Sequence, residues 1–375
     1  MKVLYLSEWY PHRYDAMAGL FVQKHAMAVA GEGVDVCVLY FHHDTQIQKA
    51  EITDVAHDGI REIIVYYPKN YMSALRQGWR YVRERWGRPD ICQLNVITKN
   101  ALLPLWLKWR RGTPYIIVEH WTGYLDVFPM FPNSPLRHRL FARIAAREAS
   151  YILAVSEDLK ESMKHCGLKN GHWGIINNVV DDFFYDRPTI ARTGKKNLLH
   201  ISCFDEPHKN VCGLLRAARQ VAEKRSDFML TIVGVGPDFE QVHSYSKALD
   251  FPAAMLRWTG ELPPERVAEE FDQADAFVLF SNYETAGIVL SESAVCGKPI
   301  ISTPVGIAPL IVNEQTGISV PVGDEQALAE AIETMLDTCR NYDSQVIRSY
   351  GEAYRFETVG KHLYNIYSEV LCHTS

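Results

Sequence analysis

The chain has 375 residues, of which 47% are hydrophobic and 22% are charged, and its formal net charge at pH 7 is −6. These values are typical of an ordinary globular protein with two or three domains, and they exclude a disordered chain. No apolar run approaches the ~18 residues that cross a bilayer as a helix, and the net negative charge without a recognition motif argues against a nucleic-acid partner.

The first predicted element is a strand at residues 2–6. This apolar run is short, carries one charge and soon meets Glu8 and Pro11, a pattern typical of a strand rather than of a signal peptide. We therefore expect the protein in the cytoplasm. Further strands of the first half are predicted at 34–39, 62–66, 91–94, 114–118 and 151–155. Helical patterns such as 20–30 and 136–149 alternate with them, which predicts a parallel sheet covered by helices on both faces.

The alternation restarts near residue 197. Strands of the second half are predicted at 198–202, 229–233, 255–259, 276–281, 299–302 and 317–320. Residues 180–196 lack an apolar period and are predicted to be a linker. The expected fold class is α/β, with two tandem doubly wound domains at 1–180 and 181–355 and a helix at 356–375 that can cross back to the first domain. Such sheets bind ligands beyond the carboxyl ends of their strands, here in an interdomain cleft.

Charge is distributed unevenly between the two halves. Residues 1–180 carry 22 Lys and Arg against 17 Asp and Glu, whereas residues 181–375 carry 17 against 28. This asymmetry suggests two domains with different partners. The eight cysteines form no CxxC pair and no histidine cluster has zinc spacing, so we predict scattered reduced thiols and no metal site.

Residues 281–297 combine the end of a predicted strand with the start of a helix. The helix is predicted to begin at Gly287 and to stop at Gly297, a typical C-terminal residue. Its start would present the backbone N–H groups of Ala286, Gly287 and Ile288. Together with the helix dipole, these groups form an anion site.

Two carboxylates flank this anion site. Glu284 precedes the helix and Glu292 lies inside it, so a bound phosphate would have one carboxylate on each side. Carboxylates accept hydrogen bonds from paired hydroxyls, as on a sugar or ribose ring. The alternative is that Glu284 is a helix N-terminal charge and Glu292 a solvated residue.

The spacing Glu-x7-Glu, followed by Cys296-Gly297-Lys298-Pro299, resembles the signature of the retaining glycosyltransferases of family 4, which have the GT-B fold of two Rossmann-like domains. The resemblance continues in the same order along nearly the whole chain. It implies that Glu284 contacts the donor sugar and that Glu292 contacts the ribose. The backbone after the first Glu would contact the diphosphate.

Residues 202–210 resemble the family's Gly-Arg-x5-Lys phosphate loop. Lys209 falls on the family's lysine, and the resemblance implies that its ammonium neutralises the departing pyrophosphate. A plain surface lysine is the alternative. Cys203 occupies the family's arginine position, and a cysteine cannot supply a fixed positive charge.

Glycine-containing segments resemble the family's donor-binding loops. Gly19 corresponds to the loop that approaches the donor phosphate, with Ala18 in place of the first of two glycines; a helix-start glycine is the alternative. Gly260 and Leu262 lie in a segment similar to the one at the nucleotide base. Residues 234–237 resemble the family's Gly-x-Gly-Pro and lack the third glycine of a dinucleotide fingerprint.

His120 follows the predicted strand 114–118, at the end where doubly wound sheets place ligands. A lone histidine is more often structural. The family has a histidine here, and the resemblance implies that His120 contacts the donor sugar. Glu119 and Asp126 are weaker candidates for contacts to the acceptor.

The resemblance implies a retaining hexosyltransferase that uses a UDP- or GDP-linked sugar and a glycan or lipid-linked acceptor, in cell-surface polysaccharide synthesis. The acceptor hydroxyl would attack from the face that the nucleotide leaves. Lys209 and the helix start at Gly287 would stabilise the departing diphosphate. No Asp-x-Asp occurs in the chain, which fits metal-independent transfer without a cofactor.

The first half is also rich in basic and aromatic residues. Residues 61–147 contain 15 Lys and Arg against 5 Asp and Glu, and segments 75–86 and 106–111 combine arginine with tryptophan. This combination suits an anionic membrane surface, so we expect peripheral association with the inner face of the cell membrane. The alternative is an ordinary solvated helix face with tryptophan in the core.

Two rival functions remain open. A GT-B shell that binds a nucleotide sugar but has lost transfer is motivated by Cys203. Another GT-B enzyme, such as an epimerase or a phosphorylase, is the second rival. A dehydrogenase fits less well because the fingerprint is incomplete.

Overall fold

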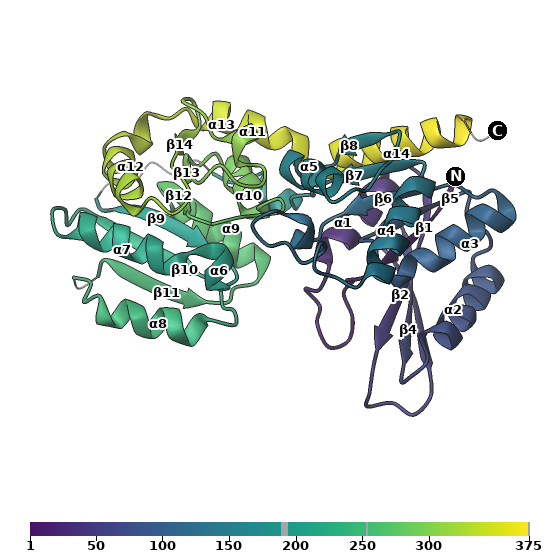
Figure 1. Cartoon of the computed structure of the whole chain (residues 1–375). Helices are drawn as coiled ribbons and strands as arrows, with labels where there is room; N and C mark the ends of the chain where they lie inside the picture. Colours follow the sequence, from purple (N-terminus) through teal and green to yellow (C-terminus); the bar gives the residue numbers. More distant parts are fainter. Residues whose placement is uncertain (189–193, 253, 374–375) are drawn as a thin grey trace. The chain divides into compact units, whose positions relative to one another are not determined.

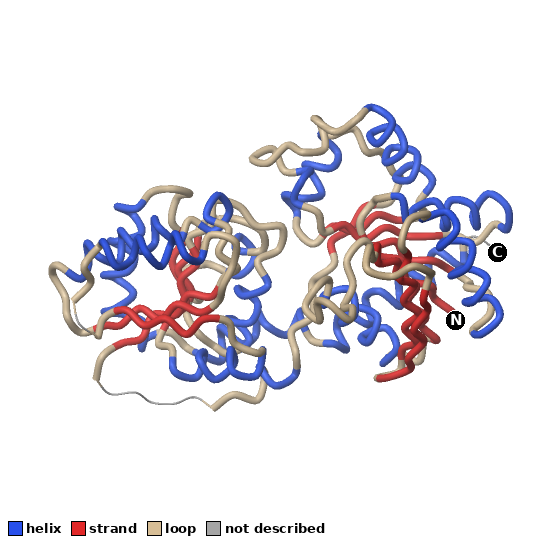
Figure 2. Tube along the Cα trace, turned by 90° about the horizontal axis from the view of Figure 1, so that it is seen from below, coloured by secondary structure: helices blue, strands red, loops and turns tan. Residues whose placement is uncertain are grey.

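The computed structural model of the chain describes residues 1–188, 194–252 and 254–373. Its contacts divide it into two compact units. Unit 1 is Met1–Val179 with Phe356–Ser375, and unit 2 is Val180–Arg355. Each unit contains one sheet with helices packed against it (Figure 1, Figure 2).

Unit 1 is built on an eight-stranded sheet. Its strands are β1 (Lys2–Ser7), β2 (Asp35–His43), β3 (Glu51–His57), β4 (Ile60–Tyr67), β5 (Ile91–Asn95), β6 (Tyr115–Glu119), β7 (Tyr151–Ala154) and β8 (Trp173–Ile175). Its helices are α1 (Leu20–Gly31), α2 (Tyr71–Arg85), η1 (Lys99–Ala101), α3 (Leu102–Arg111), η2 (Thr122–Tyr124), α4 (Leu136–Glu148), α5 (Glu157–His165) and α14 (Phe356–Cys372). The strand order is β3-β4-β2-β1-β5-β6-β7-β8, with β3 and β4 antiparallel. Strands β5 and β6 are buried along their whole length, as expected for a sheet covered on both faces.

The C-terminal helix α14 belongs to unit 1 and packs against α1. A Cβ on Gly360 would lie 2.2 Å from the carbonyl oxygen of Ala28, so only glycine allows this close approach. The buried hydroxyl of Tyr367 lies 2.8 Å from that of Tyr5 in β1 and donates to Gln93 in β5. The chain therefore returns from unit 2 to complete the first sheet's helical cover.

Unit 2 has a six-stranded parallel sheet in the order β11-β10-β9-β12-β13-β14. Its strands are β9 (Lys196–Ile201), β10 (Phe228–Val233), β11 (Leu256–Gly260), β12 (Ala276–Leu279), β13 (Ile300–Ser302) and β14 (Gly317–Ser319). Its helices are η3 (Asp182–Phe184), α6 (Glu206–Lys209), α7 (Val211–Ala222), α8 (Phe239–Ala248), α9 (Pro264–Gln273), α10 (Ile288–Val295), α11 (Ala308–Ile311), α12 (Glu325–Thr338), η4 (Cys339–Asn341), α13 (Ser344–Gly351) and η5 (Glu352–Tyr354). Figure 2 shows helices on both sides of this sheet. Nowhere in the described ranges is a helix long and apolar enough to cross a membrane.

The structure differs from the sequence-based expectations in three places. Strands β3 and β8 were not predicted; β3 is an edge strand whose alternate residues are exposed, so it lacks an apolar run. The expected linker 180–196 is wrong in its first part, because η3 forms there and Phe184 is buried against Phe271. Residues 189–193 of that linker lie outside the described part of the chain.

Candidate functional site

Two loops of unit 2 meet where the strand order of its sheet reverses. Strands β9 and β12 are parallel neighbours, although β10 and β11 lie between them in the chain. The loop after β9 leads into α6, and the loop after β12 leads towards α10. Asn282 joins the two loops: its backbone N–H donates to the carbonyl oxygen of His208 at 2.8 Å, and its Nδ2 donates to that of Pro207 at 2.9 Å. Doubly wound sheets bind ligands at such a reversal point.

These loops bring Lys209 and Glu284 into direct contact. The Nζ of Lys209, at the end of α6, lies 2.6 Å from Oε1 of Glu284. Ser281 Oγ donates to the same carboxylate oxygen at 2.8 Å. Glu284 is 9% exposed, and partial exclusion of water strengthens the attraction between the two charges. The two residues that the sequence placed far apart therefore lie in one site.

Helix α10 begins beside this pair. It starts at Ile288, one residue later than predicted, because Gly287 takes a left-handed φ of 77° as its N-cap. A Cβ on Gly287 would lie 3.4 Å from Cγ of Glu284. The carbonyl of Ala286 accepts from the N–H of Ile307 at 2.9 Å, which fixes the loop. The first N–H groups of a helix have no acceptor within the helix, so the start of α10 is suited to an anion next to Lys209 and Glu284.

The remaining residues predicted to bind the donor in unit 2 lie on α10 and after β11. Glu292 lies in the second turn of α10 and is half-buried. Gly260 ends β11 with φ 72°, and its carbonyl accepts from the N–H of Gly234 at 2.8 Å. Leu262 follows in the next loop and is half-buried. Because β9, β11 and β12 are parallel in one sheet, Gly260 and Leu262 lie at the same edge as Lys209, and their contacts to a donor stay predictions.

Close backbone packing explains why glycine occurs twice in the loop after β10. A Cβ on Gly234 would lie 2.0 Å from the carbonyl oxygen of Ser202, and one on Gly236 would lie 2.3 Å from the backbone nitrogen of Phe204. The N–H of Phe204 donates to the carbonyl of Val235 at 3.0 Å. These glycines therefore let the loop after β10 pack directly on the loop that carries Cys203.

His200 is a residue of this site that the sequence did not reveal. It is fully buried in β9; its Nδ1 lies 2.9 Å from the carbonyl oxygen of Val278, and its Nε2 lies 2.8 Å from Oγ of Ser202. Burial lowers the pKa of His200 to about 4. A neutral ring that donates through Nδ1 and accepts from the hydroxyl of Ser202 satisfies both contacts. His200 thus ties β9 to β12 just before the two loops begin.

Cys203 lies directly after Ser202 and is exposed. Desolvation raises the pKa of its thiol most, the charges of Asp205 and Glu284 raise it further, and the charge of Lys209 lowers it. The side chain at this position is therefore within electrostatic reach of both Lys209 and Glu284. A residue at 203 can influence the site, but the thiol adds no positive charge to it.

In unit 1, His120 follows β6 and is 7% exposed. Its ring packs on Phe21, with centroids 4.3 Å apart, and lies 5.9 Å from that of His25. Burial and the charge of His25 hold the pKa of His120 well below its usual range. Its Nε2 has no hydrogen-bond partner in the part of the chain that the structure describes. A buried, neutral and unsatisfied histidine nitrogen is costly to the fold, which favours a role in binding a ligand.

Glu119, a weaker candidate for acceptor contacts, instead supports the backbone around His120. It is fully buried, and its carboxylate accepts from the N–H groups of Ile97, His120 and Trp121 at 3.0–3.1 Å. Burial raises the pKa of Glu119 to about 7, although these hydrogen bonds lower it. The prediction of an acceptor contact is wrong for this side chain, because its oxygens are directed to the backbone.

Gly19 is the N-cap of α1, with φ 61°. A Cβ there would lie 2.3 Å from the carbonyl oxygen of Trp9, so the helix start packs against the loop after β1. Asp15 Oδ1 accepts from the N–H groups of Met17 and Ala18 and shapes the same loop. Close packing alone explains this glycine, and its contact with a donor stays a prediction.

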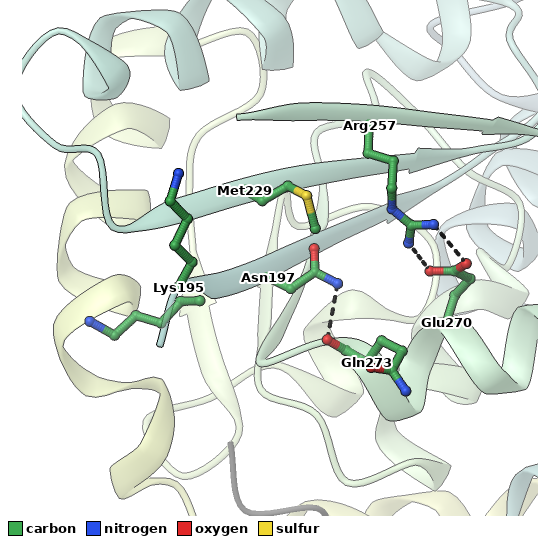
Figure 3. Close-up of a pocket in the computed structure, with 7 residues that line it drawn as sticks. Lys195, Asn197, Met229, Arg257, Glu270 and Gln273 are labelled. Atoms are coloured by element: carbon green, nitrogen blue, oxygen red, sulfur yellow. Dashed lines mark hydrogen bonds and ion pairs between the residues drawn. The ribbon is translucent and has the colours of Figure 1, made fainter. Parts of the chain in front are cut away.

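A polar hollow of about 340 Å³ lies at the opposite, amino-terminal end of the unit 2 sheet (Figure 3). Lys195 and Asn197 line it at the start of β9. Arg257 is paired with Glu270, with an Nη1–Oε1 distance of 3.2 Å, and Asn197 donates to the carbonyl of Gln273 at 3.0 Å. These partnered groups stabilise the sheet end, and the hollow is not a candidate for the donor site.

Two family models match the chain. Residues 184–349 match the model described as "Glycosyl transferases group 1", and residues 18–182 match the one described as "Glycosyltransferase Family 4". Together the two matches take in most of the chain, and they follow one another in the order of the two units.

Individual proteins show the same likeness. N-acetyl-alpha-D-glucosaminyl L-malate synthase of Bacillus anthracis is 28% identical over 241 residues, which are 61% of this chain and 62% of that protein, so the match spans less than two thirds of the relative. Sucrose-phosphate synthase from Thermosynechococcus elongatus has a TM-score of 0.78 at 17% identity and is covered over 100% of both chains. Anabaena HepE in complex with UDP-glucose has a TM-score of 0.74 at 16% identity over 98% of this chain and 100% of that one. The predicted GT-B fold, with two Rossmann-like α/β units, is confirmed.

Proposed function

The chain belongs to the group 1 glycosyltransferases of family 4, and from this premise we propose that it is a retaining hexosyltransferase that moves a sugar from a nucleotide-diphosphate sugar to a glycan or lipid-linked acceptor. The observation that carries the proposal is the contact of Lys209 with Glu284 beside the start of α10. A cation, a carboxylate and a helix start meet there at the carboxyl edge of the sheet.

This arrangement suits departure of a nucleoside diphosphate. Bond breaking at the anomeric carbon places negative charge on the leaving phosphate, and fixed cations and helix N–H groups stabilise it. Lys209 would then exchange its contact with Glu284 for one with the phosphate, which frees the carboxylate of Glu284 for hydroxyls of the donor sugar. His120 would contact the sugar through its unsatisfied Nε2, and Glu292 would accept from the ribose.

We propose UDP or GDP as the nucleotide of the donor. Anabaena HepE, which shares the fold, forms a complex with UDP-glucose, and this likeness supports a uridine donor through the fold alone. We also propose transfer without a metal ion, as the chain has no Asp-x-Asp. Among the described residues there is also no group of three His, Cys, Asp or Glu side chains placed to hold a metal. Transfer that persists with EDTA would support this part of the proposal.

The proposed setting is cell-surface polysaccharide synthesis in the cytoplasm, with peripheral association at the inner face of an anionic membrane. Exposed Cys203 favours one competing function, namely a nucleotide-sugar-binding protein with weak or lost transfer. The two functions differ in turnover and not in donor binding.

Calorimetry against UDP, GDP and ADP, followed by donor hydrolysis with a panel of UDP- and GDP-sugars, tests the proposal. We expect one nucleotide to bind and its sugars to turn over. Lys209→Met and Glu284→Gln are expected to reduce turnover by about 10²–10³-fold, as for loss of one group that stabilises transition-state charge. Lys224→Met, at an exposed lysine of unit 2, is the matched control and should leave turnover unchanged. Binding without any turnover would favour the competing function, and equal turnover in all variants would exclude the assigned site.

A further inference from the structure

Figure 1 shows helices α2, α3 and α4 of unit 1. Side chains from these three helices line an apolar groove of about 680 Å³. Its lining includes Met72, Trp79, Trp106, Trp109, Phe141 and Ile144. Trp106 is 41% exposed and Trp109 is 63% exposed. Large apolar side chains gathered around one open groove mark a surface that binds an apolar partner.

A second hollow adjoins this groove and has the opposite chemistry. It measures about 260 Å³, shares Trp79 and Trp106 with the groove, and is also lined by Arg83, Arg88 and Arg111. These three arginines have no carboxylate partner within the ranges that the structure describes. Three unneutralised guanidinium groups in one hollow are suited to bind a phosphate.

Trp79 lines both hollows. Its indole Nε1 atom is buried and has no hydrogen-bond partner among the described residues. Its ring lies 6.5 Å from that of Trp106 in an edge-to-face arrangement. A buried N–H without an acceptor is unfavourable, and an oxygen of a ligand that reaches this nitrogen would satisfy it.

The charge of the three helices narrows the choice of partner. Together α2, α3 and α4 contain 11 Lys and Arg against 2 Asp and Glu, in a chain whose net charge is −6. Two copies of such a basic face would repel one another, so self-association through it is disfavoured. An anionic surface with aliphatic chains matches both the arginines and the tryptophans.

We propose that this face is a docking site for an anionic phospholipid bilayer. The phosphate headgroup of one lipid would occupy the hollow of Arg83, Arg88 and Arg111, and an acyl chain would enter the groove beside Trp106 and Trp109. Trp79 would donate to an oxygen of the lipid. This docking site rests on the proposed membrane association but not on the chemistry of sugar transfer. Vesicle binding can therefore fail while transfer is confirmed, and transfer can fail while vesicle binding is confirmed.

The experiment is co-sedimentation of the full chain with vesicles of phosphatidylcholine, with and without phosphatidylglycerol, at low and high salt. The wild-type chain should bind the anionic vesicles at least tenfold more tightly, and salt should weaken this binding. Each cation near an anionic surface contributes about fivefold, so the triple change Arg83→Gln, Arg88→Gln and Arg111→Gln should reduce binding by at least tenfold. The control triple Lys169→Gln, Lys224→Gln and Lys247→Gln removes the same charge from exposed sites elsewhere and should bind nearly as the wild type.

The apolar part of the site is tested with Trp106→Ser and Trp109→Ser. Both side chains are exposed enough to be truncated without disturbing the core, and Tyr364→Ser on α14, 38% exposed, is the control. We expect weaker vesicle binding for the tryptophan variants only, with nucleotide binding in calorimetry unchanged in all of them. Equal binding to neutral vesicles, or equal losses in the controls, would overturn the proposal. A dimer in sedimentation that the tryptophan variants abolish would assign the groove to a second copy instead.

Discussion

The two units share one design of parallel strands and covering helices, but the buried polar residues assigned to their candidate sites differ in their hydrogen bonding. In unit 2, Lys209, Glu284 and His200 all have partners within the site before any ligand binds. In unit 1, Nε2 of His120 and Nε1 of Trp79 are buried without a hydrogen-bond partner among the residues that the structure describes. Exposed tryptophans and unneutralised arginines lie in unit 1 as well.

This difference indicates that the units have different tasks. A site whose charges and hydrogen bonds are already arranged needs little reorganisation when a charged donor binds. Unsatisfied groups cost folding free energy, and such groups are expected where a ligand completes the structure. Under the proposed function, unit 2 would hold the donor phosphate in a preorganised site, whereas the unsatisfied groups of unit 1 would be completed by the donor sugar, the acceptor and the membrane.

The largest expected effect comes from replacing one buried histidine in each unit, which tests whether the two units differ as described. In His120→Leu, an unsatisfied nitrogen is lost, so the unfolding free energy should stay the same or rise by about 1 kcal/mol, while turnover falls about 10²-fold. In His200→Leu, the carbonyl of Val278 and the hydroxyl of Ser202 lose their partner, so the unfolding free energy should fall by about 1–3 kcal/mol. Urea unfolding and donor hydrolysis measure both effects.

The variants His120→Leu and His200→Leu can be compared directly, because both histidines are buried, neutral and at or next to a central strand. A large loss of stability in His120→Leu would show that the ring is structural and that its Nε2 is satisfied in solution. Unchanged turnover in that variant would remove His120 from the donor site.

Most of the fold was predictable because strand patterns are local. All predicted strands are present, since each is a short apolar run bounded by turn residues. Strand β3 was missed although Asp58-Gly59 is a typical hairpin signal, and both residues have positive φ in the turn that joins β3 to β4. Strand β8 was missed because glycine is its central residue and none of its three residues is buried, so it lacks the apolar run that predicted the equally short β13.

The site was predictable only in part, and the reason is its non-local geometry. Spacing within one segment placed Glu284 before a helix start, and the resemblance added Lys209. The contact between them depends on the pairing of β9 with β12, which no local pattern encodes. The link through Asn282 and the support of His200 depend on the same pairing, so both were missed.

A pH series on unit 1 gives the next largest effect. Burial lowers the pKa of His25 to about 4 from an ordinary value of 6.5, and its Nε2 contacts the carbonyl of Asn177 at 2.9 Å. As the pH falls, the unfolded chain takes up this proton first, so the stability that His25 contributes is complete above pH 6.5 and is lost between pH 6.5 and 4. At roughly 1.4 kcal/mol per pKa unit, the loss between pH 7.5 and 5 is about 2 kcal/mol.

The matched variant for this series is His25→Gln, whose amide can still donate to Asn177 but does not titrate. Its unfolding free energy should fall less than that of the wild type as the pH decreases, by about 2 kcal/mol at pH 5. His120, whose pKa is also lowered, still titrates in this variant, so some pH dependence should persist. If unfolding free energy depends on pH in the same way in both proteins, the pKa of His25 in the folded chain is close to its value in the unfolded chain.

The smallest expected effect comes from restoring the family's arginine at the position of Cys203. Cys203→Arg would add a charge next to Lys209, but Asp205 and Glu284 act on the same position and would compete for the new guanidinium. Lys209 already supplies a cation to the site, so kcat/KM for donor hydrolysis should rise by less than about tenfold, well below the full value of a charge that acts on the transition state alone. Cys203→Ser is the neutral control and should leave kcat/KM unchanged.

A rise of about 10²-fold would show that unit 2 is incomplete without the arginine and would contradict its description as a preorganised site. A fall would show that the new arginine binds Glu284 and withdraws it from the donor.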